Sequence, residues 1–232
     1  MSKTAKILHL ETSTEICSIA ISADHQIVGE ATEMSGFAHS AKGTLMIEDC
    51  LIQAGLNVSD LAAVSISEGP GSYTGLRVGF AMAKGLCFAH DIPFIRIPTL
   101  RTLAYGARDE KNKGAIITPM LDARRMEVYT ESFDSKMQSV YPLEALILEE
   151  SSFAERYHKN DRNIFVGDGA HKVASWLRPT KDEILETLCH ASYQMHIAAD
   201  MYLKKEFSDI AYSKPLYLKP PNITVSKKKL LP

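Results

Sequence analysis

The stretch SEGPGSYTGLRVG (residues 67–79) joins an apolar strand pattern directly to a helical pattern and holds four glycines and one proline. A strand, a glycine turn and a helix N-terminus form a natural anion site, because free backbone N–H groups and the helix dipole both point at the turn. The spacing matches neither the phosphate-binding P-loop nor the dinucleotide-binding fingerprint. The stretch therefore favours a tight structural turn over a phosphate cradle.

The elements predicted around this turn follow one order, which starts again in the second half of the chain. Hydrophobic periodicity and turn residues define these elements. Only residues 183–188 fit a strand and a helix equally well. The predicted ranges are strands 7–10, 16–22, 26–32, 62–67 and 92–97 with helices 38–54, 74–90 and 99–107, then strands 115–121, 127–133 and 164–166 with helices 151–159, 172–177 and 191–205.

Two landmarks recur in both halves. Glu11 closes the first strand of one half and Asp122 closes the first strand of the other, and a strand runs into glycine at Gly69 and again at Gly167. Chance is the alternative, because such strand and helix units are common in α/β proteins. We expect an α/β fold with two similar lobes, residues 1–104 and 105–232, in which a crossover helix of the second packs on the first.

Composition is typical of a globular protein. Of the 232 residues, 45% are apolar and 23% charged, the formal net charge is -2, and no apolar run approaches a membrane span. So small a charge creates no global field for nucleic acid, although residues 210–232 contain lysines and no acid and could touch RNA phosphates or an acidic partner. The four dispersed cysteines and the lack of a signal segment predict a cytoplasmic protein without a zinc-thiolate site.

Catalytic patterns are sparse. The eight histidines show no metal-ligand spacing and no serine lies in a nucleophile elbow, so we expect no metal site and no catalytic residue set. Glu11 and Asp122 are candidates for a carboxylate pair across a cleft, and the alternative is that each caps a local turn. The turn 122–125 fits either an anion clamp or a solvated turn.

The helices predicted at 38–54 and 74–90 are apolar nearly all round. Such a helix must be buried nearly all round, either at the centre of a large core or half-covered by a partner. Small residues such as Gly79 and Ala83 allow another backbone to approach closely. Periodicity alone leaves both interpretations open.

Five segments match a known family. They are ILHLETS (7–13), GPGSYTGLRVG (69–79), AKGL (83–86), DARRMEVY (122–129) and PLYL (215–218). Together they resemble the TsaB family, also called YeaZ, over nearly the whole chain. Two positions depart from the family pattern, since Glu11 stands where Asp is usual and Tyr73 where Phe is usual.

The resemblance implies a duplicated actin-like, sugar-kinase-like fold and a role in making threonylcarbamoyladenosine in tRNA, at the adenosine next to the anticodon. It implies a non-catalytic partner of the transferase TsaD, which the ATPase TsaE joins. The tRNA is reached through the complex, and the chain alone forms a homodimer. TsaD holds a metal through histidines that follow the strand corresponding to 92–97, where this chain has Pro98-Thr99-Leu100.

In that family the two apolar helices build the interface with TsaD and the competing homodimer. The implied contact residues are Leu45, Met46, Cys50, Leu76, Phe80, Ala83 and Cys87. The candidate nucleotide cleft comprises Glu11, Thr12, Ser13, Asp122 and Arg124. We expect no cofactor in the isolated chain and weak ATP or ADP binding in the complex.

Two other functions stay open. One is an ATP-dependent kinase of the same fold, with residues 11–14 as a phosphate hairpin, and the other is a glycoprotease-like hydrolase. Binding and hydrolysis of ADP by the isolated chain would discriminate them.

Overall fold

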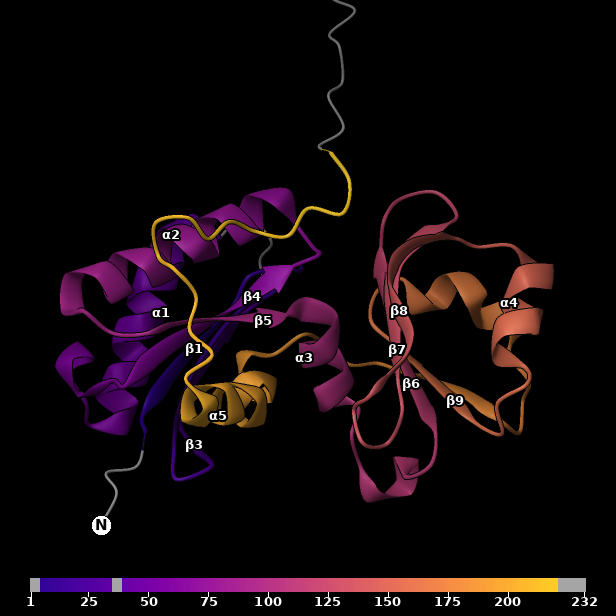
Figure 1. Cartoon of the computed structure of the whole chain (residues 1–232), viewed down its shortest axis with the longest axis horizontal. Helices are drawn as coiled ribbons and strands as arrows, with labels where there is room; N and C mark the ends of the chain where they lie inside the picture. The colour runs from indigo at the N-terminus through magenta and orange to yellow at the C-terminus, as the bar shows by residue number, and fades with distance from the viewer. Residues whose placement is uncertain (1–4, 35–38, 221–232) are drawn as a thin grey trace, which may run out of the picture.

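The computed structural model describes residues 5–34 and 39–220, which form two lobes side by side (Figure 1). The first lobe contains β1 (Ile7–Glu11), β2 (Cys17–Ala23), β3 (Gln26–Glu33), α1 (His39–Ala54), β4 (Ala63–Gly69), α2 (Tyr73–His90) and β5 (Phe94–Pro98). After α3 (Thr99–Gly106), the second contains β6 (Ile116–Asp122), β7 (Glu127–Phe133), β8 (Ser139–Ile147), α4 (Glu150–Tyr157), β9 (Asn163–Val166) and β10 (Asp182–Leu185). The 3-10 helices η1 (Val58–Asp60), η2 (Glu110–Asn112), η3 (Ala170–Trp176) and η4 (Ala191–Gln194) and the helix α5 (Met195–Lys204) complete the set.

The two sheets have the same topology. The order β3-β2-β1-β4-β5 of the first sheet recurs as β8-β7-β6-β9-β10 in the second. In each sheet three strands pair antiparallel and two more join in parallel. Glu11 and Asp122 end the equivalent strands β1 and β6. The prediction of an α/β fold with two similar lobes is confirmed.

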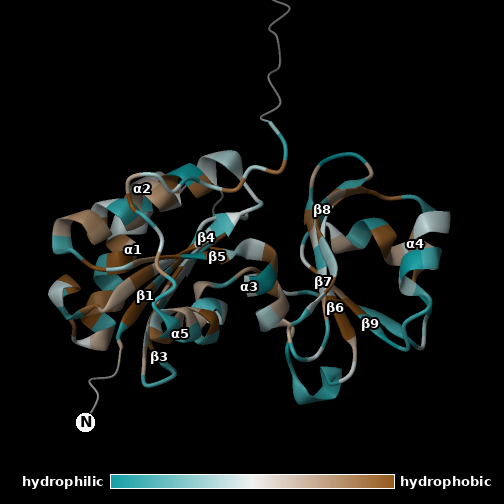
Figure 2. Ribbon diagram, in the orientation of Figure 1, coloured by the Kyte–Doolittle hydropathy of each residue, from teal (hydrophilic) through white to brown (hydrophobic). Residues whose placement is uncertain are grey.

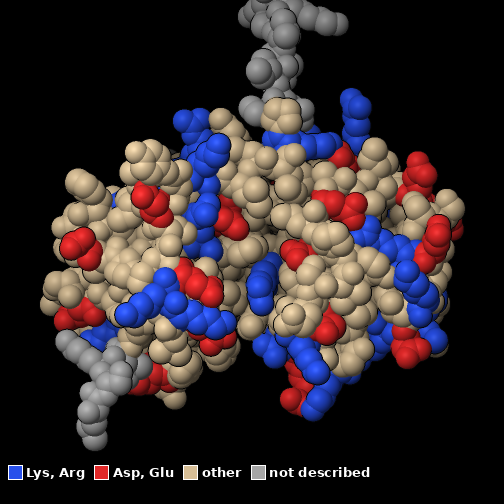
Figure 3. Space-filling view, viewed as in Figure 1, with Lys and Arg blue, Asp and Glu red and all other residues tan. Residues whose placement is uncertain are grey.

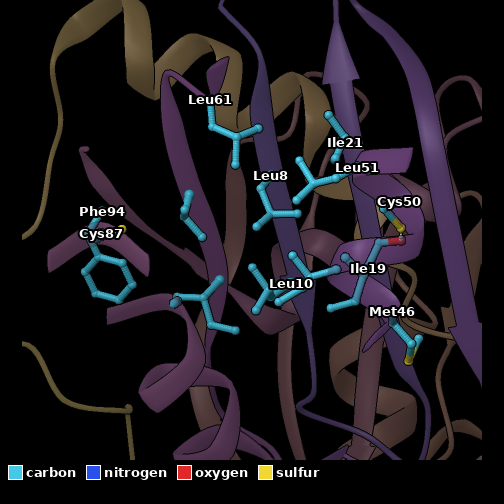
Figure 4. Close-up of a cluster of buried hydrophobic side chains, with 14 of the residues drawn as sticks. Leu8, Leu10, Ile19, Ile21, Met46, Cys50, Leu51, Leu61, Cys87 and Phe94 are labelled. Atoms are coloured by element: carbon cyan, nitrogen blue, oxygen red, sulfur yellow. Dashed lines mark hydrogen bonds between the residues drawn. The ribbon is translucent and has the colours of Figure 1, made fainter. Parts of the chain in front are cut away.

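Both faces of the first sheet are covered. Helices α1 and α2 lie on one face, where Leu8 and Leu10 of β1 pack in the cluster shown in Figure 4. On the other face, Ile7 packs with Ile197 and Ala198 of α5. Because both faces are covered, β1 is buried along its whole length, including the polar residues His9 and Glu11. In Figure 2, brown hydrophobic segments run through the strands of this sheet.

Helix α5 follows the second lobe in sequence but lies on the first, as a crossover helix does. Residues 205–220, which we call the C-terminal strap, continue from it across α2 and end between the lobes (Figure 1). Helix α3 spans the predicted boundary at residue 104.

Three elements differ from the sequence prediction, and one of them is the predicted helix 191–205, whose first four residues form the 3-10 helix η4. Strand β8 has no counterpart among the predicted strands, because Pro142 and Glu144 interrupt its apolar pattern at the sheet edge. Residues 170–176 form a 3-10 helix rather than an α-helix. Within residues 5–34 and 39–220, no helix is long and apolar enough to cross a membrane.

Candidate functional site

The glycine turn packs directly on the turn between β1 and β2. A Cβ atom at Gly71 or Gly75 would overlap the backbone of Ser13 or Thr12, and one at Gly79 would overlap the Thr12 side chain. Two hydrogen bonds close this contact, from Ser72 N to the Ser13 carbonyl (2.7 Å) and from Thr12 Oγ1 to the Gly75 carbonyl (2.9 Å). The glycines therefore allow close packing of α2 on the first turn, which is the structural role that the spacing favoured.

Glu11 lies beneath this contact and is fully buried. Its carboxylate accepts hydrogen bonds from Ser13 N (2.7 Å), Ser13 Oγ (2.5 Å), Ser67 Oγ and Cys189 Sγ (3.3 Å). Burial raises the pKa of Glu11, and these hydrogen bonds offset the rise only in part.

Thr12 and Ser13 are buried as well, so the candidate nucleotide cleft is corrected at its first three residues. The glycine turn at the start of α2 packs against Thr12 and Ser13, and the structure places none of the three side chains in the larger hollow between the lobes.

Asp122 ends β6 in the equivalent position but remains exposed. It accepts hydrogen bonds from Arg124 N (2.5 Å) and Lys172 Nζ (2.6 Å), and its own N–H donates to Asp168 (2.9 Å). Burial tends to raise the pKa of Asp122, but the bonds from Lys172 and Arg124 outweigh it and lower the pKa. Each of the two acids thus accepts a hydrogen bond from the backbone N–H two residues ahead. Glu11 and Asp122 therefore cap their local turns, which was the alternative to a carboxylate pair across a cleft.

In the described part of the chain, residues of both lobes line each of two hollows. The larger, with a volume of about 480 Å³, we call the interlobe cleft, and it includes Asp122 and Arg124 in its lining but not Glu11, Thr12 or Ser13. The smaller, of about 90 Å³, is lined by Thr14, Asp168 and Cys189 among others. The structure therefore brings together only the second-lobe part of the candidate nucleotide cleft.

The candidate interface residues require a larger correction. Met46, Cys50, Leu76, Phe80, Ala83 and Cys87 are all buried in the core of the first lobe, and Leu45 alone of the seven is exposed. Figure 4 labels Met46, Cys50 and Cys87 among the side chains of this buried cluster. They cannot contact a partner while the lobe is folded.

The outward faces of the same two helices are apolar too. Leu45 and Ile52 of α1 are 58% and 71% exposed, and Phe88 of α2 is 83% exposed. Ala81 and Gly85 lie exposed on α2 with Phe88. We call these five residues the α1–α2 face. Once the structure has shown that residues 76, 80, 83 and 87 face the core, a helical wheel places Ala81, Gly85 and Phe88 on the opposite side of α2.

Residues 5–34 and 39–220 include no group of three or more His, Cys, Asp or Glu arranged to hold a metal ion. The four cysteines are free and buried, and burial raises the pKa of Cys17 to about 11 and of Cys50 to about 12. His9 is fully buried, and burial lowers its pKa to about 3.

Most of the chain matches known proteins. The family model for TsaD, the tRNA N6-adenosine threonylcarbamoyltransferase, matches residues 16–213. The tRNA threonylcarbamoyladenosine biosynthesis protein TsaB of Haemophilus influenzae is 30% identical over 92% of this chain and 93% of its own length. The chain belongs to this threonylcarbamoyltransferase-type family and, within it, to TsaB. TsaB of Escherichia coli is 29% identical over 92% of the chain and 94% of its own length.

Solved structures agree on the fold. YeaZ from Pseudomonas aeruginosa superposes with a TM-score of 0.77 at 24% identity, over 92% of this chain and all of that one. The activator of 2-hydroxyisocaproyl-CoA dehydratase from Clostridium difficile, solved with bound ADPNP, superposes with a TM-score of 0.52 at 10% identity, over 87% of this chain and 97% of that one. These structures show the actin-like fold, and TsaB membership places the chain in the biosynthesis of threonylcarbamoyladenosine in tRNA.

Proposed function

We propose that this chain is the non-catalytic subunit that binds TsaD through the α1–α2 face and supports transfer of the threonylcarbamoyl group to tRNA. The observation that carries the proposal is the exposure of Ile52 and Phe88 on two neighbouring helices. Full burial of one such side chain contributes about 1.5–3 kcal/mol, so leaving both in water is unfavourable unless a partner covers them.

Small residues make this face suitable for a close helix contact. Gly85 lies exposed in the middle of α2, and a Cβ there would meet nothing within 4 Å. Ala81 lies one turn before it. A partner helix can therefore approach the α2 backbone and bury Phe88 at the same time.

The burial and hydrogen bonds of Glu11 and Asp122 support a non-catalytic role for the chain. Glu11 is sealed under the glycine turn, and both Glu11 and Asp122 are occupied in capping their own turns. The kinase alternative needs the first turn free for phosphate, which the packing of Gly71 and Gly75 opposes. We therefore propose no cofactor for the isolated chain and only weak ATP or ADP binding in the complex.

The remaining parts of the proposal concern assembly. The chain works in the cytoplasm, TsaE joins the TsaD pair, and tRNA reaches the chain through the complex. A homodimer of the chain alone uses the same α1–α2 face and so competes with TsaD.

The test compares two exposed apolar residues on different helices. Phe88→Glu should abolish capture of purified TsaD and dissociate the homodimer, because a charge at the centre of an interface removes an anchor worth about 2 kcal/mol or more. Leu203→Glu on α5, 74% exposed, is the matched control and should leave both intact. Thermal melts should be equal for both variants. Undiminished TsaD capture by folded Phe88→Glu would overturn the proposed interface.

A further inference from the structure

The C-terminal strap forms one wall of the interlobe cleft. It runs along the edge of β5, where Ser208 N donates to the Phe94 carbonyl (2.8 Å). It then crosses Gly69, where Leu216 N donates to the Glu68 carbonyl (2.7 Å) and leaves no room for a Cβ on the glycine. At its end Lys219 pairs with Glu127 of the second lobe. The strap therefore bridges the lobes and holds its last residues against the cleft.

Two exposed tyrosines stand at this wall. The rings of Tyr73, at the start of α2, and Tyr217, on the strap, lie with centroids 4.9 Å apart and line the cleft together with Tyr129. Tyr73 and Tyr217 are 41% and 37% exposed, so their ring surfaces are only partly used by each other. Arg77 holds Tyr73 in place, with a 3.2 Å bond to its hydroxyl and its guanidinium 5.4 Å from the ring centre.

The charges in the cleft leave a positive excess. Asp122 is paired with Lys172 and Lys219 is paired with Glu127, so these four charges cancel. Arg124 also lines the cleft and adds a further positive charge, which helps to lower the pKa of Asp122. The N-terminus of the 18-residue helix α2 adds a partial positive charge at Tyr73.

Basic side chains also lie near the end of the strap. Pro220, the last residue of the strap, lines the cleft. In Figure 3, Lys and Arg side chains lie on the upper rim, near the place where the described chain ends. A ligand that extended from the cleft over this rim would meet the positive charge of these described side chains.

We propose that the interlobe cleft binds an unpaired stretch of the tRNA substrate, with bases stacked on Tyr73 and Tyr217 and phosphates against Arg124 and the start of α2. Exposed aromatic rings beside cations form the sites that recognise single-stranded nucleic acid. A volume of about 480 Å³ suits a small planar group, and the basic side chains of described residues on the rim suit a polyanion that extends beyond the cleft. The inference rests on the proposed function, because tRNA reaches the chain in the TsaD complex.

The experiment uses the full chain in complex with TsaD and an unmodified tRNA transcript carrying 4-thiouridine. Irradiation should cross-link the tRNA to peptides containing Tyr73 or Tyr217. Cross-links to this chain only at other peptides, or none at all, would overturn the inference. Size-exclusion chromatography of the same sample reports TsaD association, so failure of the proposed function is seen separately.

Variants measured by tRNA-binding anisotropy complete the test. Tyr217→Ala should weaken binding about tenfold, whereas Tyr217→Phe keeps the ring and should stay within about twofold. Arg124→Ala should weaken tRNA binding. It should also make the plot of log binding constant against log salt concentration less steep, by about one unit of slope. Arg108→Ala removes an exposed arginine stacked on Tyr105 outside the cleft and should change neither quantity. Equal binding by Tyr217→Ala and Tyr217→Phe, or Tyr217-dependent binding of free ADP in place of tRNA, would overturn the inference.

Discussion

The β1–β2 turn and the β6–β7 turn are copies of one unit that meet different surroundings. Each follows the first strand of its lobe and begins with an acid that accepts the backbone N–H two residues ahead, in Glu11 and in Asp122. In the first lobe, α2 packs over the turn through Gly71 and Gly75. In the second lobe, strand β9 occupies the position that β4 has in the first. It is followed by the 3-10 helix η3 in place of a long α-helix, and Arg124 stays exposed at the cleft.

This difference shows that topology alone does not preserve a binding turn. The first turn has become part of the core, where Thr12 and Ser13 form hydrogen bonds with Gly75 and Glu11. In the β6–β7 turn, the side chain of Arg124 is exposed, and its backbone adopts the left-handed conformation with φ 71°. Contacts with ligands are therefore expected on the second turn.

The largest expected effect comes from loosening the sealed turn. Gly75→Ala places a Cβ against the Thr12 carbonyl, a backbone atom that cannot move aside, and overpacking of this kind costs about 1–3 kcal/mol. Gly85→Ala on the same helix meets nothing and should be neutral or stabilise the fold by up to about 1 kcal/mol. Urea unfolding measures both. A destabilisation of Gly85→Ala equal to that of Gly75→Ala would contradict the packing of the first turn.

A smaller effect should appear in the pH dependence of folding stability, because the acids of the two turns contribute to stability in opposite pH ranges. Glu11 has a raised pKa in the fold, so its contribution to stability is complete below the unfolded pKa, about 4.3, and is lost as pH rises through the folded pKa. Asp122 has a lowered pKa, so its contribution is present above about 3.9 and is lost as pH falls through the folded pKa.

Unfolding curves of wild type, Glu11→Gln and Asp122→Asn between about pH 2 and 8 would resolve these contributions. The advantage of wild type over Glu11→Gln should shrink as pH rises, and its advantage over Asp122→Asn should shrink as pH falls. Slopes of the same sign for both pairs would show that the turns share one environment.

Much of the fold could be predicted because its signals are local. Apolar strand runs, glycine turns and the recurring acids Glu11 and Asp122 all repeat with the duplicated unit. Strand β8 was harder to predict from the sequence. An edge strand needs no regular alternation of apolar and polar residues, and Pro142 interrupts the apolar pattern of β8.

The residues of the site were harder to predict, because both faces of α2 are apolar. Ala81 and Ala83 have the same side chain, yet Ala83 is buried and Ala81 is exposed. Only the position of the sheet decides which face points inward. The strap shows a second limit, since Leu216 binds Glu68 through backbone atoms that carry no signature in the sequence.

The most direct test of a non-catalytic subunit acting through the α1–α2 face is a titration of this chain into a reconstituted threonylcarbamoyl transfer reaction with fixed TsaD, TsaE and tRNA. For Phe88→Glu, the concentration giving half-maximal transfer should rise by about thirtyfold or more, while the maximal rate stays that of wild type, because only association is weakened. An unchanged half-maximal concentration with a reduced maximal rate would contradict the account, since Phe88 would then act in the transfer step and not in binding.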